Sequence, residues 1–437
     1  MSQANYSQPR GPQDWRAPLA AGPIDAIVRL PGSKSLTNRE LVLSALADSP
    51  TLLRAPLASR DSALMIAALR SLGTVIDELP NGDLRITPAP LAGPVTVDCG
   101  LAGTVMRFVP PLAALATGEI RFDGDEAARR RPMNVTIDSL RALGVQVEDA
   151  GTGALPFTLL ADGKVEGGEL EIDASSSSQF VSGLLLSAPR FEQGLTLRHR
   201  GEHLPSLPHI EMTLDTLAKR GVKVSNPEPT LWRVEPGPIA GGEFTIEPDL
   251  SNAGPFLAAA MIAGGSVTIP DWPANTTQVG REFIHILERM GAKLTLTDAG
   301  LTISGDGNIH GIDIDLSIGG ELAPVIAALA ALADSPSRIS GVAHLRGHET
   351  DRLAALSTEI NRIGGKCTET ADGLEITPST ELHGAYWESY EDHRMATAGA
   401  IIGLRVPGIV VENIGTTSKT MPNFVQLWTE MLGSEPS

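Results

Sequence analysis

The stretch LRSLGTVI at residues 69–76 contains a pattern that recurs along the chain: an apolar helical turn, a glycine and a short β-branched strand. The pattern returns as LRALGVQV at 140–147, LAKRGVKV at 217–224, LERMGAKL at 287–294 and INRIGGKC at 360–367, and fades to WTEMLG at 428–433. Its glycines are Gly73, Gly144, Gly221, Gly291, Gly364 and Gly433, at separations of 71, 77, 70, 73 and 69. Since a glycine with positive φ commonly ends a helix, each copy predicts a helix that stops there and a strand that follows.

Each copy belongs to a longer repeat. After most of the glycines, a polar turn such as PNGD at 80–83 leads to a second alternating stretch, which predicts a β-hairpin. Each repeat also contains a helix that is apolar on nearly every side and is therefore expected to be buried. These helices contain LVLSALAD, MRFVPPLAALATG, FVSGLLLSA, FLAAAMIAGG, VIAALAALAD and MATAGAII. The repeat is thus a strand, a buried helix, a strand, an amphipathic helix and a hairpin, occurring six times.

The domain organisation follows from the length of 437 residues, which favours two domains or three. Six repeats then divide as three per domain. We expect a flexible segment at 1–14, one domain at 31–242 with repeats 1–3, and a second made of 15–30 plus 243–437 with repeats 4–6. A solenoid of six stacked repeats is the alternative, although solenoid repeats usually have only about 20–50 residues.

The composition excludes several classes of protein. The 34 Lys and Arg against 52 Asp and Glu give a formal net charge of −18, which disfavours a nucleic-acid or anionic-membrane binder. Aromatic residues make up only 4% of the chain, which disfavours a nucleic-acid binder that stacks bases on aromatic side chains. Cys99 and Cys367 are too few for a disulfide framework or a four-cysteine zinc site. The polar N-terminus is no secretory signal and the most apolar run, residues 322–333, is too short to cross a bilayer, so we expect a soluble cytoplasmic protein.

The starts of the buried helices carry unexpected polar residues. Helix N-termini present free N–H groups and the positive end of the dipole, so they attract anions. Serines, Asp and Asn there could also be ordinary caps, worth ~1 kcal/mol each. Cations are unfavourable at such a position unless they bind an anion, so together the six starts predict an anion-binding cleft. The residues are Lys34, Ser35 and Arg39; Gly103 and Thr104; Ser177, Ser178 and Gln179; Asp249, Ser251 and Asn252; Glu321; and His393 and Arg394.

Two further strings combine acids and bases, RGHETDRLAAL and YEDHRMATAGA, while ARRRPM adds Arg131 and TTSKTMPNF adds Lys419. Charge runs are usually solvated surface, but arginine is preferred for bidentate binding of carboxylate and phosphate. PGSKS is not a P-loop, because Ser33 and Val28 stand where that motif needs glycine. No GxGxxG follows a strand and no His or Cys spacing makes a metal site, so nicotinamide and zinc chemistry lack support.

The motifs PGSKSLTNR, LAGTVMR, RRPM, SSSSQF, RGHETDRL, YEDHRMA and TSKTMPNF, in this order from about residue 31 to 424, strongly resemble the 5-enolpyruvylshikimate-3-phosphate synthase family. The resemblance implies an α/β (α+β) fold, a two-domain inverse α/β barrel-like architecture in which each domain holds three βαβαββ units and the domains close over a cleft. It implies transfer of the enolpyruvyl group of phosphoenolpyruvate to the 5-hydroxyl of shikimate 3-phosphate, with release of phosphate through a tetrahedral intermediate, on the pathway to chorismate and aromatic amino acids. It implies no metal and no organic cofactor.

The resemblance also implies roles for individual residues. Shikimate 3-phosphate would contact Lys34, Ser35, Arg39, Ser177, Ser178, Gln179, Ser206, Glu321 and His348. Phosphoenolpyruvate would contact Lys34, Gly103, Arg131, Gln179, Arg352, Arg394 and Lys419. Glu321 and Glu349 would be the acid–base pair. We assign Glu349 as the proton donor to the methylene carbon and Glu321 as the base at the 5-hydroxyl, with Lys34 able to replace either. We expect a monomer with these two small molecules as partners.

The chain departs from the family pattern at several positions. Many members have Asp in place of Glu321, and His344 and His348 replace an Asn and a Lys that contact shikimate 3-phosphate. Leu101 replaces a common Asn and Phe108 a Pro, so sensitivity to glyphosate does not follow from the motifs.

Three alternatives differ from this reading. The sister enzyme that transfers enolpyruvate to UDP-N-acetylglucosamine carries a Cys in the loop that here reads GDEAARRRP. A catalytically silent phosphometabolite-binding protein would be expected to lack one of Lys34, Glu321, Glu349 or Lys419, all of which are present. Cyclisation of RNA ends on a related fold is disfavoured by the net charge of −18.

Overall fold

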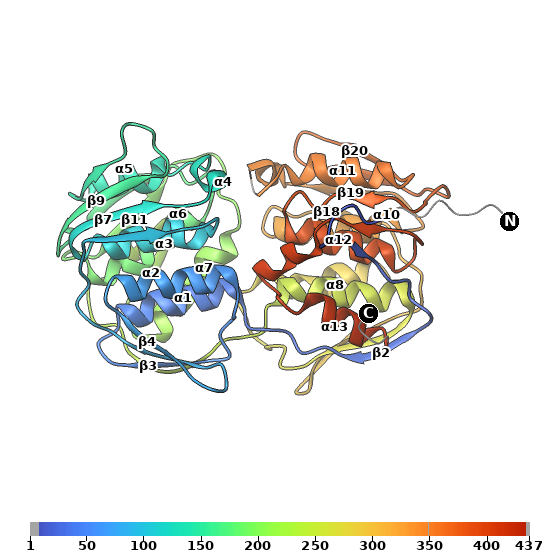
Figure 1. The fold of residues 1–437 in the computed structure, drawn as a ribbon, viewed down its shortest axis with the longest axis horizontal. Helices are drawn as coiled ribbons and strands as arrows, with labels where there is room; N and C mark the ends of the chain where they lie inside the picture. The colour runs from blue at the N-terminus through green and yellow to red at the C-terminus, as the bar shows by residue number, and fades with distance from the viewer. Residues whose placement is uncertain (1–7, 348, 434–437) are drawn as a thin grey trace. The chain divides into compact units, whose positions relative to one another are not determined.

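The computed structural model describes residues 8–347 and 349–433, which form two compact units (Figure 1). Unit 2 is Pro31–Glu247, and unit 1 combines the described residues up to Leu30 with those from Pro248 onward. Each unit has its own hydrophobic core, so the six repeats do not share the continuous core of a solenoid. No helix among the described residues is long and apolar enough to cross a membrane.

Unit 2 contains three four-stranded sheets with one common pattern. In each, the first strand pairs in parallel with the second, and a hairpin completes the sheet with antiparallel pairs. The strand orders are β14-β3-β5-β4, β6-β7-β9-β8 and β10-β11-β13-β12. The bounds are β3 (Thr51–Arg54), β4 (Val75–Glu78), β5 (Leu84–Thr87), β6 (Val95–Asp98), β7 (Thr117–Asp123), β8 (Gln146–Glu148), β9 (Phe157–Asp162), β10 (Gly168–Ile172), β11 (Leu195–His199), β12 (Val224–Glu228), β13 (Leu231–Val234) and β14 (Gly242–Thr245).

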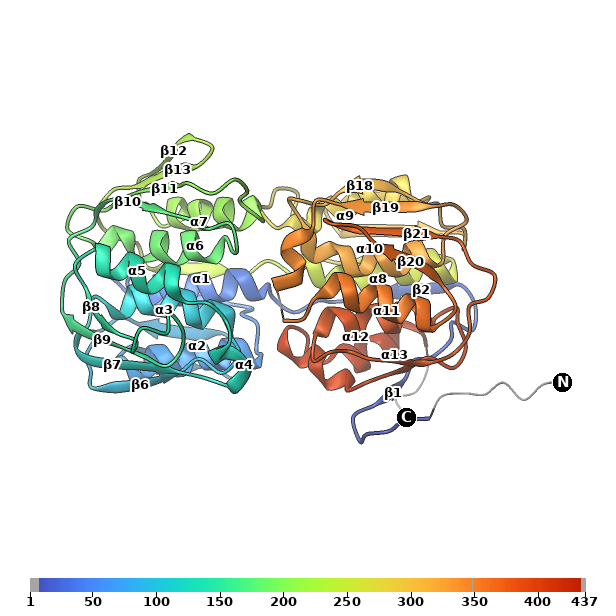
Figure 2. The same ribbon diagram turned by 90° about the horizontal axis from the view of Figure 1, so that it is seen from above.

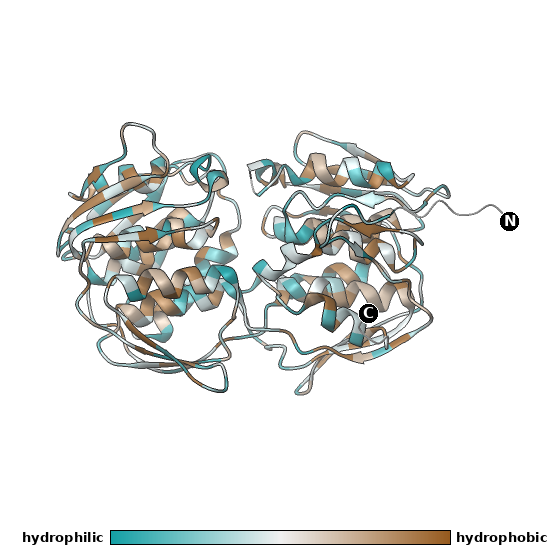
Figure 3. Ribbon diagram, viewed as in Figure 1, coloured by the Kyte–Doolittle hydropathy of each residue, from teal (hydrophilic) through white to brown (hydrophobic). Residues whose placement is uncertain are grey.

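The helices of unit 2 divide into a buried and an amphipathic set. The buried set is α1 (Lys34–Ala45), α3 (Gly103–Ala113) and α6 (Gln179–Ser187), and the amphipathic set is α2 (Arg60–Ser71), α5 (Asn134–Ala142) and α7 (Leu207–Lys219). The short helices are α4 (Glu126–Arg129) and η1 (Ala188–Arg190). The three buried helices pack against one another, and Figure 3 shows that α3 is largely apolar whereas α1 begins with hydrophilic residues. They form the centre of the core, as the sequence predicts.

Unit 1 repeats the arrangement with two four-stranded sheets, β16-β17-β15-β2 and β18-β19-β21-β20, and one three-stranded sheet, β1-β23-β22. The strands are β1 (Trp15–Arg16), β2 (Ile24–Ile27), β15 (Gly265–Ile269), β16 (Lys293–Thr297), β17 (Gly300–Gly305), β18 (Asp313–Asp315), β19 (Ser337–Ser340), β20 (Lys366–Glu369), β21 (Leu374–Thr377), β22 (Tyr386–Trp387) and β23 (Val410–Val411). The helices are α8 (Leu250–Ala263), α9 (Phe283–Arg289), α10 (Ala323–Ala331), α11 (Arg352–Arg362), α12 (His393–Gly403), α13 (Phe424–Met431), η2 (Val279–Glu282), η3 (Gly320–Leu322), η4 (Ala343–Gly347) and η5 (Ile414–Lys419). The buried set is α8, α10 and α12, which pack together.

The first strand of two repeats lies in the sheet of the other unit. Strand β2 precedes α1 in the chain but pairs in parallel with β15 of unit 1, with Val267 opposite Ala26. Strand β14 precedes α8 but pairs in parallel with β3 of unit 2, with Phe244 opposite Leu53. The boundary expected after residue 242 therefore falls inside β14, which stays with unit 2. The segment 1–14 was expected to be flexible, and its residues 1–7 lie outside the described part of the chain. At its other end, Asp14 is attached to unit 1, because its carboxylate accepts hydrogen bonds from the Asn413 N–H and the Tyr386 hydroxyl.

The six repeat glycines confirm the sequence-based reading of the helix ends. All have positive φ, between 66° at Gly433 and 115° at Gly73. At Gly73 the glycine N–H donates to the Arg70 carbonyl and the following Thr74 N–H donates to the Leu69 carbonyl, which is the hydrogen-bond pattern of a glycine-terminated helix. The chain can then turn directly into the next strand.

Candidate functional site

The predicted site residues of unit 2 gather where three buried helices begin. The side-chain amide of Asn38 on α1 donates to the Thr104 hydroxyl on α3 at 2.7 Å. The Arg39 guanidinium on α1 donates to the Ser182 hydroxyl on α6 at 3.2 Å. The first two turns of α1, α3 and α6 therefore lie together, which brings three positive helix ends and their N–H groups into one region suited to an anion.

Lys34 is the first residue of α1, because the Ser33 hydroxyl caps the helix by accepting a hydrogen bond from the Leu36 N–H. Its ammonium group lies 3.5 Å from the carboxylate of Asp61, whose side chain is only 5% exposed. Sequence analysis did not single out Asp61, since an acid in the first turn of α2 is what the helix dipole alone would favour. The ion pair restrains the position of a lysine expected to bind substrate.

Gly103, the first residue of α3, is surrounded by three polar side chains. A Cβ atom at this position would lie 3.0 Å from Gln179 Oε1, 3.3 Å from Arg131 Nη2 and 3.4 Å from Arg107 Nη1. Three of the predicted phosphoenolpyruvate contacts, Gly103, Arg131 and Gln179, are thus brought together. Arg107 was not predicted. It stands four residues after Gly103 in LAGTVMR, one helical turn along α3, and this spacing could have identified it.

Arg39 is nearly inaccessible, with 1% of the residue exposed. Its guanidinium donates to the Thr213 hydroxyl at 2.8 Å, the His209 carbonyl at 2.8 Å and the Ser35 carbonyl at 2.9 Å. These bonds join α1 to the start of α7. A contact between Arg39 and shikimate 3-phosphate stays a prediction, while its bonds to protein partners give it a structural role that the sequence did not indicate.

The three predicted phosphate-binding serines precede helices. Ser177 and Ser178 come directly before α6, and the Ser177 hydroxyl accepts a hydrogen bond from the Gln179 N–H at 3.2 Å. Ser206 comes directly before α7 and has left-handed backbone angles, φ 54° and ψ 50°, with no capping bond from its side chain. Its hydroxyl is therefore not used to cap α7.

Unit 1 shows the same meeting of helix starts. The Ser251 hydroxyl on α8 donates a hydrogen bond to the carboxylate of Glu321, which lies in η3 directly before α10. The guanidinium of Arg394, on α12, lies 3.7 Å from the same carboxylate. The structure thus places Glu321 between the starts of α8 and α12, with 19% of its side chain exposed.

Glu349 is held by two cations. Lys419, at the end of η5, donates to one of its oxygens, and the Arg352 guanidinium donates to the other at 3.1 Å. Arg352 is 2% exposed and also donates to the Asp392 carboxylate at 2.7 and 3.3 Å. Desolvation lowers the pKa of Arg352, but the charges of Asp392 and Glu349 outweigh it, so the pKa is raised. Asp392 belongs to the YEDHRMA motif, but the sequence predicted no role for it.

Two histidines, His344 and His348, depart from the family pattern, and the structure describes only the first. His348 lies outside the described residues. His344, in η4, packs against Gly320 beside Glu321, since a Cβ atom on Gly320 would lie 2.5 Å from its Nε2. Burial lowers the pKa of the His344 ring, and the positive charge of Arg352 lowers this pKa further. The negative charge of Glu321 acts in the opposite direction but is the smallest of the three effects, so the neutral ring is favoured at pH 7.

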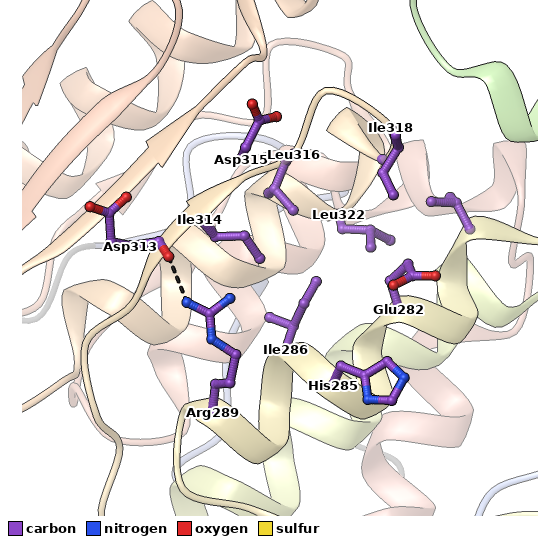
Figure 4. A pocket seen from close by; sticks show the side chains of 12 residues that line it. Glu282, His285, Ile286, Arg289, Asp313, Ile314, Asp315, Leu316, Ile318 and Leu322 are labelled. Carbon is purple, nitrogen blue, oxygen red and sulfur yellow. Dashed lines mark hydrogen bonds between the residues drawn. The ribbon is translucent and has the colours of Figure 1, made fainter. Parts of the chain in front are cut away.

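A separate cavity of about 290 Å³ lies in unit 1, between α9 and the segment from β18 to η3 (Figure 4). Ile286, Ile314 and Leu322 line its interior, and the Arg289 guanidinium donates to the Asp313 carbonyl at 2.6 Å. None of the predicted site residues lines it, although Gly319 and Leu322 lie within two residues of Glu321 in sequence. Among the described residues no cluster of three or more His, Cys, Asp or Glu side chains could hold a metal ion.

Comparison with known proteins gives one consistent result. The family model described as EPSP synthase (3-phosphoshikimate 1-carboxyvinyltransferase) matches residues 19–428. The 3-phosphoshikimate 1-carboxyvinyltransferase of Kocuria rhizophila is 59% identical over 432 residues, which cover 96% of this chain and 97% of that protein. Two structures of EPSP synthase from Acinetobacter baumannii, each 24% identical, superpose with TM-scores of 0.82 and 0.79. The first match covers 96% of this chain and 98% of that one, the second 94% and 97%, and both show likeness of fold.

Proposed function

The chain belongs to the EPSP synthase (3-phosphoshikimate 1-carboxyvinyltransferase) family and has the enzymatic activity of that family in the shikimate pathway. We propose which residues bind the substrates and transfer the protons in this reaction. The family, the fold class and the activity that the sequence motifs predicted are confirmed. The reaction adds the 5-hydroxyl of shikimate 3-phosphate across the double bond of phosphoenolpyruvate. Elimination of phosphate from the tetrahedral intermediate then restores the double bond.

The cluster in unit 2 binds shikimate 3-phosphate. Ser177, Ser178 and Ser206 contact its phosphate, because their hydroxyls stand at helix starts where the dipole favours an anion. Lys34, Ser35, Arg39 and Gln179 supply further contacts, as do Glu321 and His348. The ion pair with Asp61 keeps Lys34 near the start of α1, where it can reach a bound phosphate.

Phosphoenolpyruvate is bound mainly by the cations of unit 1. Arg352, Arg394 and Lys419 offset the charges of its phosphate and carboxylate, and guanidinium groups suit both by bidentate hydrogen bonding. Unit 2 contributes Lys34, Arg131 and Gln179, together with Gly103, whose missing side chain leaves room between Arg131 and Gln179. The cations stabilise the charge that develops as the ketal phosphate forms.

The single observation that carries the acid–base assignment is the position of Glu349 between Lys419 and Arg352. An anionic substrate that draws these cations to itself leaves the Glu349 carboxyl group able to carry a proton. Glu349 then protonates the methylene carbon of phosphoenolpyruvate during addition and removes a proton from the resulting methyl group during elimination. Glu321 accepts the proton of the 5-hydroxyl, and the Ser251 hydroxyl orients its carboxylate. Lys34 can serve in either role.

The proposal is tested by phosphate release from phosphoenolpyruvate with shikimate 3-phosphate as acceptor, compared with UDP-N-acetylglucosamine. We expect release only with shikimate 3-phosphate, and loss of release in Glu321→Gln with binding of shikimate 3-phosphate preserved. A Glu321→Gln variant with wild-type turnover would remove Glu321 from the mechanism. A monomeric state and a cytoplasmic location belong to the same proposal, and sedimentation of the purified chain tests the first.

A further inference from the structure

Two consecutive residues before α12 have an unfavourable backbone conformation. Tyr390 and Glu391 have φ of 54° and 56°, in the left-handed region where the Cβ atom of an L-residue crowds the backbone. They stand directly before Asp392, whose carboxylate accepts the bonds of Arg352 and caps α12 by accepting from the Arg394 N–H at 2.8 Å. Such a turn persists only where surrounding groups hold it.

The group that holds this turn from one side is Glu359. Its side chain is 0% exposed, and its carboxylate accepts hydrogen bonds from the Tyr390 hydroxyl at 2.7 Å and the Glu388 N–H at 3.1 Å. The Arg362 guanidinium lies 3.0 Å away and offsets the buried charge. From the other side, Glu412 accepts a hydrogen bond from the Ser389 N–H at 2.9 Å. Residues 388–391 are thus fixed at three successive positions.

Helix α11 connects this support to the arginine at its own start. Arg352 and Glu359 are seven residues apart on α11, which is about two helical turns, so they lie on the same side of it. Helices α11 and α12 are neighbours (Figure 2). The first residue of α11 contacts Asp392 and a residue two turns later contacts Tyr390. One helix therefore sets the position of both ends of the turn.

We infer that Glu359 and Tyr390 are positioning residues for the phosphoenolpyruvate-binding cations Arg352 and Arg394. The inference rests on the proposed function, which gives the two arginines that role. If the Tyr390 hydroxyl is removed, the turn relaxes and Asp392 moves away from its place. Arg352 then loses its paired hydrogen bonds, and Arg394 loses the cap that fixes the first turn of α12. Phosphoenolpyruvate binding weakens, although neither Glu359 nor Tyr390 is assigned a substrate contact.

The test compares Tyr390→Phe, Glu359→Gln and Glu359→Leu by steady-state kinetics with both substrates and by thermal unfolding. Because misplacing a binding group by a fraction of an ångström is costly, we expect Tyr390→Phe to raise the KM for phosphoenolpyruvate about 10-fold, with the KM for shikimate 3-phosphate unchanged. Glu359→Gln keeps an oxygen acceptor for the tyrosine and should be less affected than Glu359→Leu. The matched control is Tyr386→Phe, which also loses a tyrosine hydroxyl bonded to a carboxylate, that of Asp14 at 3.0 Å.

Arg394→Lys is measured in parallel to separate the inference from the proposed function. If Arg394→Lys leaves the KM for phosphoenolpyruvate unchanged, the proposed role of α12 fails and the inference fails with it. If Arg394→Lys raises that KM and Tyr390→Phe does not, only the positioning role is overturned. A fall in unfolding temperature and in kcat with both KM values unchanged also overturns it, since that result describes a merely structural pair.

Discussion

Lys419 donates a hydrogen bond to the carboxylate of Glu349 across a separation of 70 residues. The two residues lie in consecutive repeats, one at the end of η5 and the other before α11. The pair joins a cation expected to bind phosphoenolpyruvate to the carboxyl group expected to protonate it. Without substrate, Lys419 therefore balances the negative charge of Glu349. With phosphoenolpyruvate bound, the same contact can influence proton transfer from Glu349.

Replacing Glu349 with Gln removes the proton donor but keeps the shape of the side chain. We expect kcat to fall by about 10²–10⁴-fold, the usual contribution of a positioned acid or base, with binding of shikimate 3-phosphate retained. Steady-state kinetics and titration calorimetry measure the two quantities. Glu369→Gln is the control, because Glu369 pairs with Arg346 at a more exposed site. A kcat of Glu349→Gln within a few-fold of wild type would falsify the acid–base assignment.

Replacing Gly103 with Ala places a methyl group against Gln179 and Arg131, at 3.0 and 3.3 Å from their polar atoms. These side chains must shift, so we expect the KM for phosphoenolpyruvate to rise about 10-fold. Folding should not suffer, since Ala is a better helix former than Gly. Gly237→Ala serves as the control, because a methyl group there meets no atom within 4 Å. Equal kinetics for both variants would show that the space at Gly103 is not needed.

Breaking the buried ion pair of Glu40 with Arg220 should strongly destabilise unit 2. Arg220 is 0% exposed and donates through Nε to Glu40 at 2.8 Å, while burial raises the pKa of the Glu40 carboxyl. Glu40→Leu leaves an unpaired buried cation, so we expect a loss of about 3–5 kcal/mol of unfolding free energy in denaturant titrations. The double variant with Arg220→Met should recover much of that loss. A double variant as unstable as the single one would show that the pair itself stabilises the fold.

The pH dependence of stability should reveal Asp149. Hydrogen bonds from the Arg141 guanidinium and from the Gly153 and Gly151 N–H groups lower the pKa of this carboxyl from 3.8 to about 2. A depressed native pKa means that the stabilisation is complete above about pH 4 and is lost as pH falls through about 2. We therefore expect Asp149→Asn to be less stable than wild type near neutral pH, with the difference shrinking toward pH 2. A difference that does not change with pH would contradict this origin.

Several features of the site followed from local sequence. The glycines after each amphipathic helix, such as Gly73 and Gly364, mark helix ends because positive φ is a property of a single residue. The polar starts of the buried helices were equally visible, since Lys34, Gly103 and Arg394 stand just before the apolar segments of these helices. Residues such as Asp61 and Arg107 were not, because nothing in their own segments separates them from ordinary helix residues.

The repeat, the order of its elements and the family of the chain can be predicted from the sequence, because each depends on short-range patterns and on motifs of a few residues. The tertiary structure alone decided which strands pair, so that β2 joins β15 and β14 joins β3. It also decided that Arg39 bonds to Thr213 and that Glu359 holds Tyr390. The physical reason is that backbone hydrogen-bonding groups are alike in every strand, and that the partner of a buried charge is set by packing between distant segments.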